Sequence, residues 1–145
     1  MKSLLALTKD DSGSSAVEFA LLAPVLAVVL LGVVDGWSLA SFALSMRAGV
    51  GSAASLYLQG AGDDSAVRST ALANWQDHPE DADVTIVRTY KCGTEVVAST
   101  DMCDGSKSPA IYITVTATGT WTAPFEVDFL GTEQDMVHEQ VIRVR

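Results

Sequence analysis

The stretch Gly13-Ser14-Ser15-Ala16-Val17-Glu18-Phe19 decides how the N-terminal third of this chain folds. Glu18 is a lone carboxylate at the start of a long apolar run, because no other charged residue occurs between Gly13 and Asp35. A charged side chain costs about 2.5–3.5 kcal/mol near the centre of a membrane segment, and somewhat less near its end. Cleavage after Gly13 would offset this cost, because the new α-amino group of Ser14 would lie one helical turn from Glu18. The residues therefore favour a processed precursor with a membrane helix.

The pattern continues beyond Glu18 in a recognisable order. Ala20-Leu21-Leu22-Ala23-Pro24-Val25-Leu26 is followed by an aliphatic run and then by Gly32-Val33-Val34-Asp35. Taken together, the segment from Gly13 to about Trp37 resembles the TadE-like family, the minor pilins or pseudopilins of the tight-adherence pilus, a type IVb-like pilus. The matching positions are Gly13, Glu18, Phe19, Pro24 and Asp35.

The resemblance implies a structural protein rather than an enzyme. A prepilin peptidase would cleave after Gly13, and Glu18, followed by Phe19, would pair with the amino terminus of Ser14 or, in a filament, with that of a neighbouring subunit. The implied partners are prepilin peptidase, other minor pilins and the major pilin of the same pilus. The implied location is the bacterial inner membrane, with the C-terminal domain outside the cytoplasm and with incorporation into the pilus as a further step.

Four further residues of the apolar helix are candidates for a role in the membrane or in assembly. Pro24 is expected to weaken or kink the helix, because it has no N–H to donate; it is either a tolerated proline or, as in similar pilins, a point of local unwinding. Gly32 and Gly36 begin a series of small residues that either lets another helix approach closely or arises by chance in a helix rich in alanine and glycine. The series continues with Ser41, Ser45, Gly49 and Ala53. Asp35 is expected to face lipid headgroups, a partner's basic residue or water.

The chain divides into a leader, a helix and one small domain. We predict a leader at residues 1–13, a transmembrane helix at residues 14–60 and an extracytoplasmic domain at residues 61–145. The mean hydropathy of +0.27 comes from the first third of the chain. The glycines of Gly60-Ala61-Gly62 are expected to end the long helix.

The pattern beyond residue 60 predicts an α+β domain. Asp63-Asp64-Ser65 offers N-cap side chains for a short second helix, which His78-Pro79 would end. A small antiparallel sheet of about four strands follows, and Trp121–Phe125 is expected to leave the third strand because of Pro124. The alternation and the β-branched residues place the strands at 84–90, 95–98, 111–118 and 136–144.

The two cysteines, Cys92 and Cys103, favour a disulfide. Ten residues lie between them, and a domain exported to an oxidising compartment would form the bond. The chain-entropy model gives it about 3 kcal/mol of stabilisation. Two free thiols are the alternative. A metal site is not expected, since His78 and His138 lack ligand spacing to the cysteines, and no cofactor is expected.

Charge and motifs exclude other classes of function. The net charge of −9 and the lack of a basic patch argue against nucleic acid as a partner. The sequence contains no recognisable catalytic motif. One alternative is a secreted or membrane-anchored periplasmic binding domain with a conventional signal sequence, cleaved after Ser38-Leu39-Ala40. Another is a membrane-anchored enzyme or accessory protein with an uncleaved helix. Trp37 is expected to be an interfacial anchor at the membrane surface.

Overall fold

The computed structural model describes residues 14–125 and 131–144 of the chain. It contains two helices and four strands in the order α1, α2, β1, β2, β3, β4. The architecture is α+β, as the sequence predicts. Gly13 and the predicted leader lie outside the described residues, so the division of the chain at residues 13 and 60 stays a prediction.

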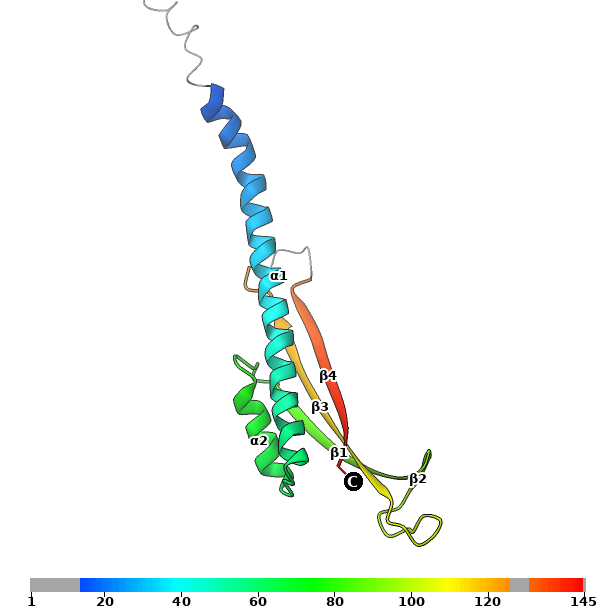
Figure 1. The fold of residues 1–145 in the computed structure, drawn as a ribbon. Helices are drawn as coiled ribbons and strands as arrows, with labels where there is room; N and C mark the ends of the chain where they lie inside the picture. The colour runs from blue at the N-terminus through cyan, green and yellow to red at the C-terminus, as the bar shows by residue number, and fades with distance from the viewer. Residues whose placement is uncertain (1–13, 126–130, 145) are drawn as a thin grey trace, which may run out of the picture.

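Helix α1 (Ser14–Leu58) is one continuous element that runs through Pro24. Its N-terminal half stands clear of the domain, and its C-terminal half packs against the sheet and α2 (Figure 1). The helix ends at Leu58 and is capped by Gly60, which has a φ of +92°. The N–H groups of Gly60 and Ala61 donate to the carbonyls of Tyr57 and Leu56, both at 3.0 Å. This is a Schellman motif, which glycine favours because it carries no Cβ.

Helix α2 (Asp64–Asn74) begins at the predicted N-cap. The Asp63 carboxylate accepts a hydrogen bond from the Ser65 N–H at 2.9 Å, which satisfies one of the free donors of the first turn. The helix packs against α1 where α1 carries Gly49. A Cβ at Gly49 would lie 2.7 Å from the Ala71 carbonyl oxygen and 3.1 Å from Trp75 Cβ. The C-terminal end of the small-residue series in α1 therefore packs against α2 of the same chain.

The sheet is antiparallel, with the strand order β2-β1-β3-β4. Its strands are β1 (Asp83–Cys92), β2 (Glu95–Val97), β3 (Ala110–Thr122) and β4 (Glu133–Arg143). Strand β3 is longer than predicted and includes Trp121, which pairs with Gln134 of β4. The strand continues because the chain reaches Pro124 only after the last pair, so the proline removes no ladder hydrogen bond.

The core lies between one face of the sheet and the two helices. Alternate residues of β3 point into it, as the sequence predicts for Ile113, Val115 and Ala117. Helix α1 contributes residues only from its C-terminal half. The largest core cluster comprises Met46, Val50, Ala53, Ala54, Tyr57, Val67, Ala71, Trp75, Val84, Ile113, Val115, Ala117 and Ile142.

The predicted disulfide joins Cys92 to Cys103, with a Cα–Cα distance of 5.5 Å. It ties the end of β1 to the loop before β3. We refer to β2 and the loop before β3 as the tip, and to the N-terminal half of α1 that stands clear of the domain as its bare half. The tip lies at the end of the domain opposite to the bare half (Figure 1).

The helix contact at Gly49 can be tested with a matched pair of alanine variants. Gly49→Ala should lower the free energy of unfolding by about 1–3 kcal/mol, because its Cβ would collide with backbone of α2. Gly51→Ala should raise it by about 0.5–1 kcal/mol, because nothing lies within 4 Å of the added atom and alanine favours helix. Denaturant unfolding of the detergent-solubilised protein measures both. Equal effects of the two substitutions would contradict the packing described.

Candidate functional site

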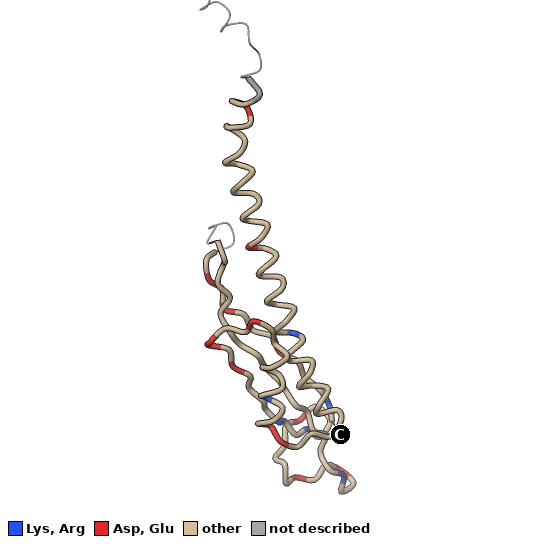
Figure 2. Tube along the Cα trace, turned by 90° about the vertical axis from the view of Figure 1, so that its left-hand side faces the viewer, with Lys and Arg blue, Asp and Glu red and all other residues tan. Residues whose placement is uncertain are grey.

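The N-terminal half of α1 presents an apolar surface that no other element of the described residues covers. The helical segment Ala16–Leu58 is long and apolar enough to cross a membrane, which fits a single-pass membrane protein. From Phe19 to Val34 no charged residue occurs (Figure 2). Large side chains in this part of the helix are more than half exposed, a state that water disfavours and lipid favours. They include Val17, Phe19, Leu21, Leu22, Val25, Leu26, Val28, Val29, Leu30 and Val33.

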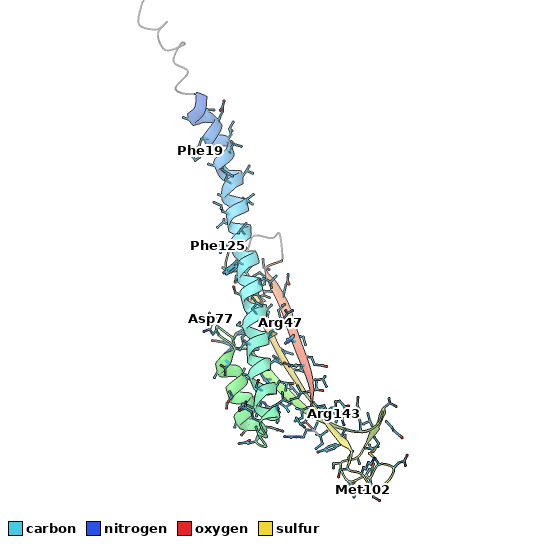
Figure 3. The ribbon with its side chains drawn as sticks, viewed as in Figure 1. Phe19, Arg47, Asp77, Met102, Phe125 and Arg143 are labelled. Atoms are coloured by element: carbon cyan, nitrogen blue, oxygen red, sulfur yellow. A yellow bond between two sulfur atoms is a disulfide. The ribbon has the colours of Figure 1, made fainter. Side chains whose placement is uncertain are left out.

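Glu18 and Phe19 lie in the second turn of α1, four and five residues after Ser14. Both are exposed, and Figure 3 shows Phe19 near the free end of the helix. Residues four apart share one face of an α-helix, so Glu18 lies above the position of Ser14. The roles assigned to Gly13, Ser14, Glu18 and Phe19 stay predictions.

The sequence suggested that Asp35 faces lipid headgroups, a partner's basic residue or water. In the structure its side chain does not lie in water. Its side chain is buried, with 1% of its surface exposed, and one carboxylate oxygen accepts a hydrogen bond from the Phe125 N–H at 3.0 Å. The loop after β3 covers this part of the helix and brings a backbone donor to the carboxylate. A carboxylate can be buried where hydrogen-bond donors replace water, which is how the chain accommodates Asp35 at the end of the apolar run.

A second bond fixes the adjoining end of β3 to the next turn of α1. The Trp121 indole N–H donates to the Ser38 hydroxyl oxygen at 3.2 Å, and Trp121 itself is buried. We refer to Asp35, Ser38, Trp121 and Phe125 as the junction. It joins the end of the apolar helix to the end of the sheet. Sequence reasoning missed Ser38 and Phe125, because residues more than 80 positions apart carry no local signal of their contact.

The other predicted helix residues have different surroundings. Gly32 has open space around its Cα, with nothing within 4 Å of an added Cβ. Gly36 lies next to the junction and is half-buried, whereas Pro24 is exposed. An external helix could therefore approach the chain at Gly32, but the opposite end of the small-residue series is already occupied by α2.

A groove runs beside the junction between α1, the segment after α2 and the end of β3. It measures about 520 Å³ and combines aromatic side chains with hydroxyl groups. Its lining includes Trp37, Ser38, Phe42, Asp77 and Trp121. Among the described residues, no group of three or more His, Cys, Asp or Glu side chains is placed to hold a metal ion.

A polar network holds the two helices to the first strand. Arg88 of β1 forms a bidentate salt bridge with Asp64 of α2. The Tyr57 hydroxyl of α1 donates a hydrogen bond to the same carboxylate at 2.5 Å. The Arg88 guanidinium also lies over the Tyr57 ring, 5.7 Å from its centroid. The hydrogen bonds from Arg88, and then from Tyr57, lower the pKa of Asp64 below its ordinary value. Sequence reasoning assigned Asp64 only to the helix start.

Residues 13–55 match the family model described as TadE-like protein. Nothing among the curated proteins or the solved structures matches the chain. The matched segment is the long helix from its start to its last turn, together with Gly13. Over this segment, which is less than a third of its length, the chain is similar to TadE-like proteins, a similarity that suggests a protein associated with the Tad pilus.

The junction predicts a specific effect of Asp35. Asp35→Ala should lower stability by about 1–3 kcal/mol, because the Phe125 N–H loses its acceptor. The same substitution should also increase the rate of amide hydrogen exchange at Phe125, measured in micelles. Asp35→Asn retains an oxygen acceptor and should have the smaller effect on both quantities. Unchanged exchange at Phe125 in Asp35→Ala would show that the loop does not depend on this bond.

The Asp64 network predicts a dependence of stability on pH. Folding lowers the pKa of Asp64, so its contribution is present above the unfolded pKa of about 3.9 and is lost as the pH falls through the folded value. Asp64→Asn should cost about 1 kcal/mol near neutral pH and should flatten the loss of stability below pH about 4. Urea unfolding between pH 2 and 7 measures it. The control is Asp104→Asn, at an exposed carboxyl of the tip loop, which should leave the profile unchanged.

Proposed function

We propose that this chain is a TadE-like structural minor pilin, or pseudopilin, of a Tad-type type IV pilus. A prepilin peptidase cleaves it after Gly13. The mature protein is held in the bacterial inner membrane by the N-terminal half of α1, with its domain outside the cytoplasm. It acts in pilus assembly or adhesion with other minor pilins and with the major pilin.

The observation that carries this proposal is the division of α1 into two halves. The first half is apolar, exposed and almost free of charge, whereas the second half supplies the core residues Met46, Val50, Ala53 and Tyr57. One continuous helix is therefore both a membrane anchor and a central element of the domain. A subunit built in this way can leave the lipid and pack its bare half against other helices without unfolding its domain.

Glu18 supports the proposal through its position. It lies one turn into the helix that would begin at Ser14 after cleavage, so the new α-amino group would lie beside its carboxylate. Opposite charges within one turn lower the cost of keeping the carboxylate in lipid. In an assembled pilus the same carboxylate would pair with the amino terminus of a neighbouring subunit and set its axial position.

The junction favours this processing over the conventional signal sequence. Cleavage after Ala40 would remove Asp35 and Ser38 from the mature protein. The Phe125 N–H and the Trp121 indole N–H would then lose their acceptors at the end of the sheet, and with each bond a net stabilisation of about 0.5–1.5 kcal/mol. The secreted-domain alternative therefore requires a less stable product.

The size of the domain supports a minor rather than a major component. A major pilin of this system would be expected to be far shorter, whereas this chain carries a four-stranded sheet and a second helix beyond α1. Additional surface on a few subunits is useful for contact with partners. This part of the proposal rests on the resemblance.

The amino terminus of the membrane-bound protein tests the proposal. Intact mass and N-terminal sequencing should give Ser14 when a prepilin peptidase is coexpressed and Met1 when it is absent. Gly13→Leu should block the cleavage, because the peptidase would meet a side chain before the scissile bond. A terminus at Ser41, or at Met1 in the presence of the peptidase, would refute the proposal.

Glu18 separates processing from assembly. Glu18→Gln should be cleaved as the wild type is, but should fail to copurify with the other pilins, because a neutral amide cannot pair with an amino terminus. The matched control is Glu139→Gln on the exposed face of β4, which should be cleaved and copurified normally. Normal copurification of Glu18→Gln would remove Glu18 from the assembly mechanism.

A further inference from the structure

Two exposed aromatic side chains lie at the same level along α1, where the exposed apolar half of the helix ends. Trp37 of α1 is 74% exposed and Phe125, after β3, is 52% exposed. The backbone of Phe125 is bound to Asp35, and Trp37 is two residues from Asp35, a rise of about 3 Å along the helix. Figure 3 shows Phe125 beside α1 at the edge of the domain that faces the free helix. Segments about 90 positions apart therefore bring aromatic rings to one level.

This level coincides with the expected edge of the lipid core. Residues 16–34 would span about 28 Å as an α-helix, close to the thickness of about 30 Å of the hydrocarbon core. The aromatic pair then lies at the boundary between the acyl chains and the headgroups, where Trp and related rings are enriched in membrane proteins. The side chain of Trp37 also leans toward the N-terminus of its helix, and so toward the lipid.

The two rings lie on different sides of the helix. Asp35 faces the loop that carries Phe125, and a residue two positions later is turned by about 200° around the helix. Trp37 lines the groove beside the junction instead. The helix is therefore flanked by an aromatic side chain on each side as it leaves the lipid.

We propose that Trp37 and Phe125 form a membrane-interface collar that seats the domain directly on the outer surface of the bilayer. The collar inserts at the depth of the headgroups, and the Asp35 bond holds its Phe125 half in place. This inference rests on the membrane anchoring in the proposed function. It adds to it a lipid-binding surface of the domain itself and a fixed distance between domain and membrane.

The charges near the collar indicate which lipids it fits. The end of the sheet beside the junction carries several exposed carboxyl groups: Asp77, Glu80, Asp81, Asp83, Glu133 and Asp135. Carboxylate oxygens of Asp81 and Asp135 lie 2.7 and 3.1 Å from the Thr120 hydroxyl oxygen and share its one O–H donor, so the two carboxylates lie close together. Such an edge is repelled by anionic headgroups, and zwitterionic lipid is the fitting partner.

Tryptophan quenching in reconstituted vesicles tests the collar. The parent is full-length Trp37→Phe, which retains the buried Trp75 and Trp121 as a common background. Three variants each add one tryptophan to it: Phe125→Trp at the collar, Leu26→Trp within the span and Met102→Trp at the tip. Met102 is 69% exposed and lies at the far end of the domain (Figure 3), so it is the matched control.

The vesicles are phosphatidylcholine brominated either near the headgroup or deep in the acyl chains. Phe125→Trp should lose emission mainly to the shallow bromines, and Leu26→Trp mainly to the deep ones. Met102→Trp should lose no more than the parent. The wild type should lose more emission than the parent to the shallow bromines, which reports Trp37.

Two results would overturn the inference, and they differ. If Leu26→Trp is quenched but Phe125→Trp behaves like Met102→Trp, the chain is inserted and the domain stands away from the lipid, so only the collar fails. If Leu26→Trp is not quenched either, the span itself is not in the membrane, and the anchoring in the proposed function fails with it.

Discussion

The buried carboxylate of Asp35 constrains both parts of this molecule. Its acceptor oxygen is bound to the backbone of Phe125, and it stands at the end of the uncharged run that begins at Phe19. A carboxylate there must have polar partners, because neither lipid nor an apolar core solvates it. The loop after β3 supplies such a partner, so the position of one acid in the helix determines where the sheet must end.

This constraint makes the long apolar helix and the domain one mechanical unit. Helix α1 is continuous from Ser14 to Leu58, and the sheet is attached to it both through the core and at the junction. The C-terminal half of α1 contacts α2 at Gly49 and supplies Tyr57 to the polar network with Asp64 and Arg88. Movement of the helix along its axis therefore carries the sheet with it, which a flexible stalk would not do.

The sequence predicted those parts of the molecule that depend on local pattern. The long helix, the second helix after Asp63 and the alternation of β3 could be read from neighbouring residues, and the disulfide from the presence of only two cysteines. Burial of Asp35, the salt bridge of Arg88 with Asp64 and the extension of β3 to Thr122 could not. Each depends on segments more than 10 positions apart, and their contact follows from the packing of the whole chain. The missed features are therefore the polar contacts that fix elements relative to one another.

The disulfide has a physical reason at the opposite end of the domain. The helices cover the sheet near the core, but the short β2 and the loop before β3 extend beyond them (Figure 1), and Val96 and Met102 are exposed there. A segment that buries little apolar surface gains little from the hydrophobic effect. The Cys92–Cys103 bond limits the unfolded conformations of this loop instead. The domain thus has two differently secured ends: the end beside the N-terminal half of α1 is held by hydrogen bonds to the helix, and the far end is held by a covalent bond.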